Sequence, residues 1–410
     1  MGKATVDTGE TGETSEVQDW LERPIFVTGL MKSGTTLLLS LLDGHPDILA
    51  YPDEPSFHRT LLREYESREQ MLVDFLYGTP NRAHFGAEIL ERDPELLKAD
   101  LLSWSEPAPF STVPSRDEFE ELVDNKVLRS MDEPQQEKAI DLEAYFEEIY
   151  GFFEDESVRT PKELIRRTMK ALAKARRADA DAGYEHWLFK QPFAHFREGK
   201  LDWFRDTYPA GKMIVLLRDP RGYVNSLLDY VQARWPDGRK WRLPPDVARM
   251  LSFLTRVTDV RSDYRGFLFL DEREPVVDVL PLTYESVVRN TEGTMRRVAR
   301  FLELPFDDIL TRPTKLGVSV RVTTATDDTK ADKVYSKSVR KWEHQLKPTQ
   351  IAILESLCGE VLQREIFEDA VSSSALQKAI RPVAGSVTGL LDRLRRAALQ
   401  LESPPGGPFV

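Results

Sequence analysis

The chain has 410 residues, a formal net charge of −12 and one cysteine, Cys358. Its length suffices for a full α/β core with an insertion, as one large domain or as two. The acidity argues against nucleic acid as the main partner, although it leaves room for a small anion in a locally basic cleft. A lone cysteine excludes an intrachain disulfide and favours a reducing compartment, so we expect a cytoplasmic protein.

The first segment, residues 1–21, is polar and acidic, and we expect it to form a disordered tail. No early segment has the apolar run of a signal peptide or a membrane span. Residues 25–28 form a short apolar run that predicts a buried strand. Thr35–Leu42 then predicts an apolar helix, with Gly44 at its C-terminal cap.

Four more buried strands are predicted further along the chain, in "DILAYPDEPSF" (ending at Pro52), "HWLFK", "KMIVLLRDP" and "VVDVLPLTYE". Residues 58–183 form a charged helical insertion, in which Thr160 and Glu163 make a capping box for one helix. Strand–helix alternation predicts a three-layer α/β fold, with a parallel sheet flanked by helices. Ligands bind such folds beyond the carboxyl ends of the strands.

The C-terminal segment, residues 371–410, contains the amphipathic helix "SVTGLLDRLRRAALQL" and a Pro/Gly-rich end. We expect this helix to dock on the core or on a second subunit, which would make a homodimer. The alternative is weak attachment to an anionic membrane surface, which we do not expect.

The first predicted strand ends in the loop "GLMKSGTT". Gly29 and Gly34 have the spacing of a phosphate-binding loop, G-x-x-x-x-G-K-[ST], but Thr35 follows the second glycine and Lys32 lies two residues before it. Backbone N–H groups at such a helix start cradle an anion. A cation, flexibility and hydroxyl donors come from Lys32, Ser33, Gly34, Thr35 and Thr36. The alternative is a tight turn that holds no ligand.

The displaced lysine resembles the 5′-phosphosulfate loop of the sulfotransferases that use 3′-phosphoadenosine 5′-phosphosulfate (PAPS). A second motif, "RDPRGYVNS", resembles the family's 3′-phosphate site, with Arg218 and Ser226 as the ligands. The arginine fork suits a terminal phosphate because it donates two parallel hydrogen bonds. Asp219 would then orient or cap the following helix, whereas in a nucleotide hydrolase it would hold a metal.

Three further segments fit the same family. "LPLTYESV" resembles the strand that ends near the adenine, so Tyr284 is a nucleotide contact or, alternatively, a core tyrosine. "YSKSVRKWEHQLKP" resembles a late loop over the nucleotide, with Ser338, Arg340 and Lys341 as phosphate contacts, although many members have glycine where Arg340 stands. Lys190 in "FKQPF" resembles the lysine that faces the reacting sulfate in the tyrosylprotein and carbohydrate branches.

An acceptor hydroxyl also needs a general base. In the tyrosylprotein branch a glutamate after the second strand is the base, and "YPDEPSF" offers Glu54 or Asp53 there. We favour Glu54, which matches the E-P-x-x-F pattern of many bacterial members. The histidine of the enzymes that act on phenols and steroids is missing after Lys190, and His195 stands three residues beyond its place.

The sequence is therefore identified as a member of the PAPS-dependent sulfotransferase family, with its domain in residues 22–370 and a P-loop-like fold. The resemblance implies sulfuryl transfer from PAPS to a hydroxyl of a carbohydrate, lipid, peptide or small molecule, with release of PAP and without a metal. Lys32 and Lys190 would stabilise charge, and Glu54 would take the proton. Two alternatives stay open. One is an ATP-dependent P-loop kinase, which the missing lysine after Gly34 disfavours; the other is an inactive nucleotide-binding protein.

Overall fold

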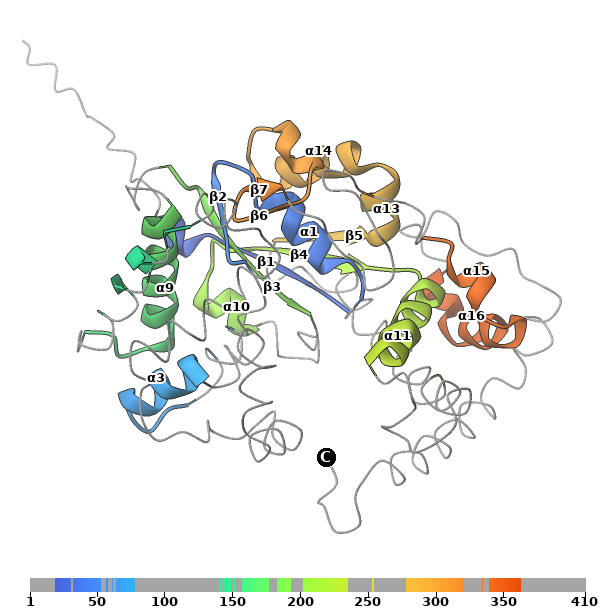
Figure 1. Cartoon of the computed structure of the whole chain (residues 1–410), viewed down its shortest axis with the longest axis horizontal. Coiled ribbons are helices and arrows are strands. Elements are labelled where there is room, and N and C mark those ends of the chain that lie inside the picture. The colour runs from blue at the N-terminus through green and yellow to red at the C-terminus, as the bar shows by residue number, and fades with distance from the viewer. Residues whose placement is uncertain are drawn as a thin grey trace, which may run out of the picture.

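The computed structural model describes residues 19–30, 32–52, 57, 61, 64–77, 140–141, 143–145, 147–148, 151, 157–176, 183–192, 202–234, 253, 278–319, 334 and 339–362. Figure 1 shows a central sheet with helices on both sides. The five strands are β1 (Pro24–Gly29), β2 (Ile48–Ala50), β3 (His186–Pro192), β4 (Lys212–Leu217) and β5 (Asp278–Thr283). All neighbouring strands pair in parallel, in the order β2-β3-β1-β4-β5.

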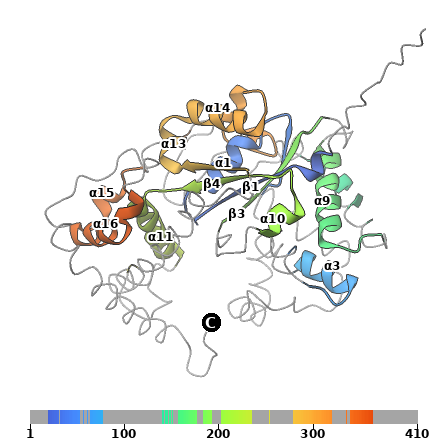
Figure 2. The same ribbon diagram turned by 180° about the vertical axis from the view of Figure 1, so that it is seen from behind.

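The predicted three-layer α/β fold with a parallel sheet is confirmed. One face of the sheet is covered by α1 (Thr35–Leu42), α13 (Tyr284–Arg289) and α14 (Thr291–Leu302), and the other by α9 (Pro161–Arg176), α10 (Asp202–Thr207) and α11 (Pro220–Arg234). The view from behind in Figure 2 shows the same two layers. Successive strand residues point to opposite faces, so both faces need apolar residues. This is why these strands read as continuous apolar runs.

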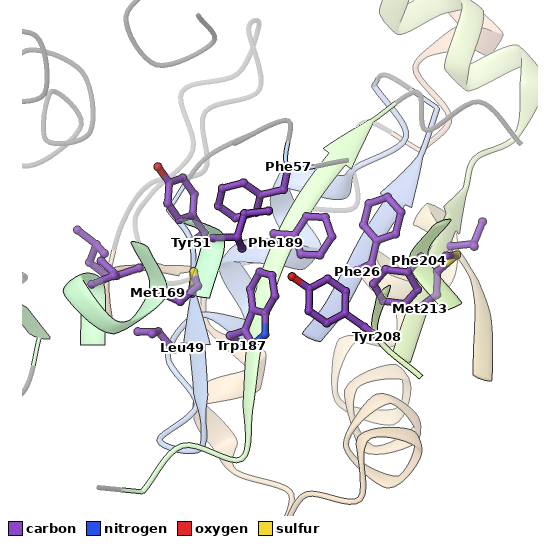
Figure 3. Packing of buried hydrophobic residues seen from close by; sticks show 14 of the residues in the cluster. Phe26, Leu49, Tyr51, Phe57, Met169, Trp187, Phe189, Phe204, Tyr208 and Met213 are labelled. Atoms are coloured by element: carbon purple, nitrogen blue, oxygen red, sulfur yellow. The ribbon is translucent and has the colours of Figure 1, made fainter. Parts of the chain in front are cut away.

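The face toward α9 and α10 carries an aromatic cluster, shown in Figure 3. The rings of Phe26 (β1) and Phe189 (β3) stack with centroids 4.7 Å apart, and Trp187 stacks on Phe189 at 5.3 Å. Fully burying each such side chain stabilises the folded state by about 1.5–3 kcal/mol. The cluster therefore fixes β3 against β1, and with it every residue at the carboxyl end of β3.

Two terminal details of the predicted elements differ from the structure. β2 ends at Ala50 rather than at Pro52. Gly44 is not a left-handed cap of α1, because the cap residue is Asp43 in the right-handed region and Gly44 has no positive φ. A Cβ at Gly44 would lie 2.6 Å from Ile309 Cγ1, so glycine is needed there for close packing.

The capping box of α9 is confirmed. The Glu163 carboxylate accepts from the Thr160 backbone N–H at 2.9 Å, and the Thr160 hydroxyl accepts from the Glu163 N–H at 3.3 Å. α9 and α3 (Arg68–Tyr77) belong to the predicted insertion, most of which lies outside the described residues, as do residues 1–18 of the predicted tail and the C-terminal amphipathic helix. The end of the predicted disordered tail is ordered, because the apolar Trp20 and Leu21 lie in the short helix η1 and are buried against the core. The domain boundaries remain predictions.

The remaining elements follow β5 or flank the core. They are η1 (Trp20–Glu22), η2 (Asp308–Thr311), the two-stranded pair β6 (Thr314–Lys315) and β7 (Val318–Ser319), α15 (Trp342–Gln345) and α16 (Pro348–Leu362). Both α15 and α16 pack beside α11. No helix in the described part of the chain is long and apolar enough to cross a membrane.

Candidate active site

The glycine-rich loop joins β1 to α1 at the carboxyl edge of the sheet. Gly34 is the N-cap of α1 with φ 96°, a conformation that favours glycine. A Cβ on Gly34 would lie 2.4 Å from Tyr284 Cδ2, so the loop and the ring touch only because that side chain is absent. Lys32 also has a left-handed backbone, with φ 66°. The first N–H groups of α1 have no partner within the helix, which suits them to an anion.

Lys190 lies at the carboxyl end of β3, next to this loop. It pairs with Val27 of β1 in the parallel register. Its side chain is 2 % exposed, and its ammonium donates a hydrogen bond to Thr36 Oγ1 at 2.8 Å. The register of β3 with β1 therefore places the buried Lys190 ammonium beside the first turn of α1.

Arg218 follows β4 and reaches the same loop from the other side. Its Nη1 donates to the Lys32 carbonyl oxygen at 2.7 Å. Its guanidinium lies 4.4 Å from the centre of the Tyr284 ring, at the end of β5. Residues after β1, β4 and β5 thus contact one another directly, and Lys190 joins them from β3.

A second arginine, Arg221, stabilises the turn that carries Arg218. Its Nε and Nη2 donate to the Asp219 carboxylate, and its Nη1 donates to Glu355 of α16 at 2.9 Å. Asp219 Oδ1 also accepts the Arg221 backbone N–H at 2.8 Å, at the start of α11. The predicted capping role of Asp219 is confirmed.

Glu285 connects α13 to the same turn. Its Oε1 accepts the Asp219 backbone N–H at 3.2 Å, and its Oε2 is buried and accepts no hydrogen bond from the described residues. Burial, followed by the nearby Asp219 carboxylate, raises the pKa of Glu285 to about 7. This carboxyl therefore changes charge near neutral pH.

The late basic loop packs beside α11. Val339 is buried against Tyr284, and Lys341 Nζ lies 3.9 Å from Asp229 Oδ2 of α11. Arg340 is exposed, and its Nε lies 3.5 Å from Glu343 Oε1. The loop therefore adds Lys341 to the α11 side of the site, while Arg340 stands at the surface.

The other predicted site residues are placed as follows. Ser33 is buried and donates its hydroxyl to the Leu30 carbonyl at 2.6 Å, so it closes the loop. Ser226 is half-buried in α11. Asp53, Glu54, His195 and Ser338 lie outside the described residues. Among the residues that the structure describes, no group of three or more His, Cys, Asp or Glu has the arrangement of a metal site.

Three neighbours of the site were not predicted from the sequence: Arg221, Glu285 and Tyr230. Lys32 Nζ lies 4.8 Å from the centre of the Tyr230 ring, which stands in α11. Arg221 and Glu285 belong to the same sequence motifs as Arg218 and Tyr284. The signal available in the sequence was therefore a charged residue within each motif. Tyr230 is four residues after Ser226, which puts the two on one side of a helix; that spacing was the available signal.

Comparison with solved structures gives distant similarities, and none of the curated proteins matches the chain. The chain is 15% identical to a sulfotransferase domain from the curacin biosynthetic pathway, covering 82% of this chain and 96% of that one, with a TM-score of 0.41. It is 17% identical to the sulfotransferase domain of the Synechococcus PCC 7002 olefin synthase (82% and 94% covered, TM-score 0.41). Retinol dehydratase in complex with androsterone and the inactive cofactor PAP is 15% identical (83% and 81% covered, TM-score 0.33).

A family model gives the decisive match. The model described as "Sulfotransferase family" matches residues 24–308, which is more than half of the chain. The matched region includes the glycine-rich loop, Lys190, the Arg218 turn and Tyr284. The chain therefore belongs to the sulfotransferase family and is a sulfotransferase enzyme.

Proposed function

We propose that this enzyme transfers the sulfuryl group of PAPS to a hydroxyl group of an acceptor and releases PAP. The observation that carries the proposal is the direct contact among residues from four strand ends. Lys190 donates to Thr36, Arg218 donates to the Lys32 carbonyl, and Arg218 stacks on Tyr284. Positive charge comes from Lys190 beside Thr36, from Arg218, and from Lys32, whose ammonium lies over the Tyr230 ring of α11; this suits a donor that carries anionic groups at two positions.

The residues fit a nucleotide that is bound at both ends. The cradle at Gly34, the first N–H groups of α1, and Thr35 and Thr36 suit a 5′-phosphosulfate. Arg218, with Ser226 and Lys341 from the α11 side, suits a 3′-phosphate, for which a guanidinium fork is a strong partner. Tyr284 packs against the Arg218 guanidinium and is only 5% exposed, so it would act on the nucleotide mainly by holding Arg218 in place. Ser338 and Arg340 of the late loop remain proposed phosphate contacts.

In the proposed reaction the acceptor oxygen attacks sulfur, the bond between sulfur and the 5′-phosphate oxygen breaks, and the acceptor proton passes to a base. PAPS supplies the activated sulfuryl group, and this chain supplies positioning and charge. Lys32 and Lys190 would stabilise negative charge on the transferring and leaving oxygens, because fixed cations in a buried site act strongly on developing charge. We propose Glu54 as the base. The acceptor is a hydroxyl of a carbohydrate, lipid, peptide or small molecule, and a cytoplasmic location remains our proposal.

The proposal is tested by turnover. We expect the purified enzyme, incubated with heavy-sulfur PAPS and a cell extract, to form products that carry the heavy label in mass spectrometry. We expect this turnover to survive EDTA, because Lys32 and Lys190 take the place that a magnesium ion has in kinases. Turnover with ATP and magnesium that EDTA abolishes would support a kinase instead, and PAP binding without turnover would support an inactive nucleotide-binding protein.

Arg218 gives a prediction about donor recognition. Arg218→Ala should weaken PAP binding by about 2–3 kcal/mol, the range for losing a hydrogen bond between charged groups. It should barely affect adenosine 5′-phosphosulfate, which has no 3′-phosphate. Calorimetry with both ligands measures the difference. Because Arg218 also holds the Lys32 carbonyl, equal weakening of both ligands would mean that it only supports the loop, and the 3′-phosphate assignment would fail.

A further inference from the structure

Glu285 is a buried acid that contacts the residue after the arginine that we assign to the donor. It holds the backbone of Asp219, the residue next to Arg218, through the 3.2 Å hydrogen bond to the Asp219 N–H. Its other oxygen, Oε2, is buried and accepts no hydrogen bond from any described residue. A buried carboxylate is stable when several donors surround it, so an acid with so few donors favours its neutral form.

The charged groups around Glu285 act in opposite directions. Asp219 disfavours ionisation of Glu285, and Arg218 favours it. The Asp219 carboxylate is itself shared with Arg221, which also pairs with Glu355 from α16. The positive charge of Arg218 favours the ionised form of Glu285, so an ionised Glu285 and a bound phosphate would both be stabilised by the same guanidinium.

We propose that Glu285 is a positioning residue that sets the affinity for the donor. When Glu285 is neutral, the positive charge of Arg218 is available to bind the 3′-phosphate. When Glu285 is ionised, it competes with that phosphate for Arg218. The inference rests on the proposed donor role of Arg218. A dianion bound at Arg218 disfavours a second negative charge nearby, so it holds the proton on Glu285. By linkage, affinity for the donor is highest where Glu285 is already protonated and falls as the pH rises above about 7.

The test is the affinity for PAP at pH 7.0 and at pH 8.5, measured by calorimetry on the wild-type protein and on Glu285→Gln. Glutamine keeps an oxygen for the Asp219 N–H but cannot ionise. We expect wild-type affinity to fall about threefold to tenfold across this window and the variant to stay constant. The phosphates of PAP ionise near pH 6, so their own charge changes little here. AMP, which lacks a 3′-phosphate, should show no such fall with either protein.

Glu292→Gln is the matched control, because Glu292 is an exposed glutamate of α14 that pairs with Arg296. This variant should keep the wild-type pH dependence. Repeating the titration in two buffers of different ionisation enthalpy measures proton uptake, and we expect uptake when wild-type protein binds PAP but not when it binds AMP. Proton uptake is measured on the wild-type protein, so it tests the role of Glu285 even if Glu285→Gln does not fold.

The outcomes separate the two proposals. Equal pH dependence in wild type and Glu285→Gln, or no proton uptake by the wild type with PAP, would overturn the role of Glu285 alone. Absence of PAP binding at every pH would overturn the proposed donor, and this inference with it.

Discussion

We expect Lys190→Met to lower turnover by about 10²–10³-fold, the usual cost of removing one preorganised group that stabilises charge in the transition state. Methionine keeps the apolar stem of the side chain and removes the ammonium that binds Thr36 Oγ1. Lys190 is buried, and burying a charge costs free energy unless partners compensate for it. The variant loses that cost together with the hydrogen bond to Thr36, so its unfolding temperature should change little. Steady-state turnover and thermal unfolding of one preparation measure both effects.

The sheet provides a matched control for Lys190. Lys212 is also a largely buried strand lysine, but it lies at the amino end of β4, where it donates to the Phe301 carbonyl and to Glu303. Lys212→Met should cost stability and leave turnover nearly unchanged. Comparable losses of turnover in the two variants, or normal turnover in Lys190→Met, would contradict a role for Lys190 in the reaction.

The second large effect is expected for Glu54→Gln, which should lower turnover by roughly 10²–10⁴-fold as a general base is lost. Glu54 itself lies outside the described residues. The chain leaves β2, however, toward the carboxyl edge of the sheet, where Lys190 lies. Ala50 pairs with Leu188, two residues before Lys190, and the Tyr51 N–H donates to the Leu188 carbonyl at 2.8 Å. Because a base acts on the acceptor and not on the nucleotide, PAP affinity should stay within about threefold.

Asp53→Asn is the control for Glu54, and it should cost much less turnover. A large loss in Asp53→Asn with a small one in Glu54→Gln would exchange the two roles. Near-normal turnover in both single variants and in the double variant would exclude a carboxylate base at this position. His195 would then be the next residue to test.

The local features of the fold were predictable from the sequence. The helix Thr35–Leu42 and the capping box of Thr160 and Glu163 were predicted as the structure has them, since apolar runs and caps are local signals. The end of β2 and the C-terminal cap of α1, predicted at Gly44, were predicted wrongly. Both depend on neighbours distant in sequence: β2 on its pairing with β3, and Gly44 on the side chain of Ile309.

The contacts that build the candidate site were less predictable. Motif order suggested that Lys32, Lys190 and Arg218 stand at strand ends, but only the register of β1 with β3 brings Lys190 to Thr36. The elevated pKa of Glu285 could not be read from the sequence, because it results from burial and from the approach of Asp219. Sequence motifs identify which residue types are present, whereas burial and neighbouring groups in the fold set the pKa of those residues.

The ion pair between Arg221 and Glu355 has a consequence for the minimal folding unit. The two residues are 134 positions apart, each side chain is only 7% exposed, and Glu355 lies beyond residue 308, where the family match ends. A chain truncated at that boundary would leave the Arg221 guanidinium without one of its two carboxylate partners. Removing one partner of a buried ion pair costs about 3–5 kcal/mol, a large part of the stability of a typical domain. We therefore expect a stable catalytic unit to extend through α16, because Glu355 of this helix holds Arg221 and, through it, the turn that carries Arg218.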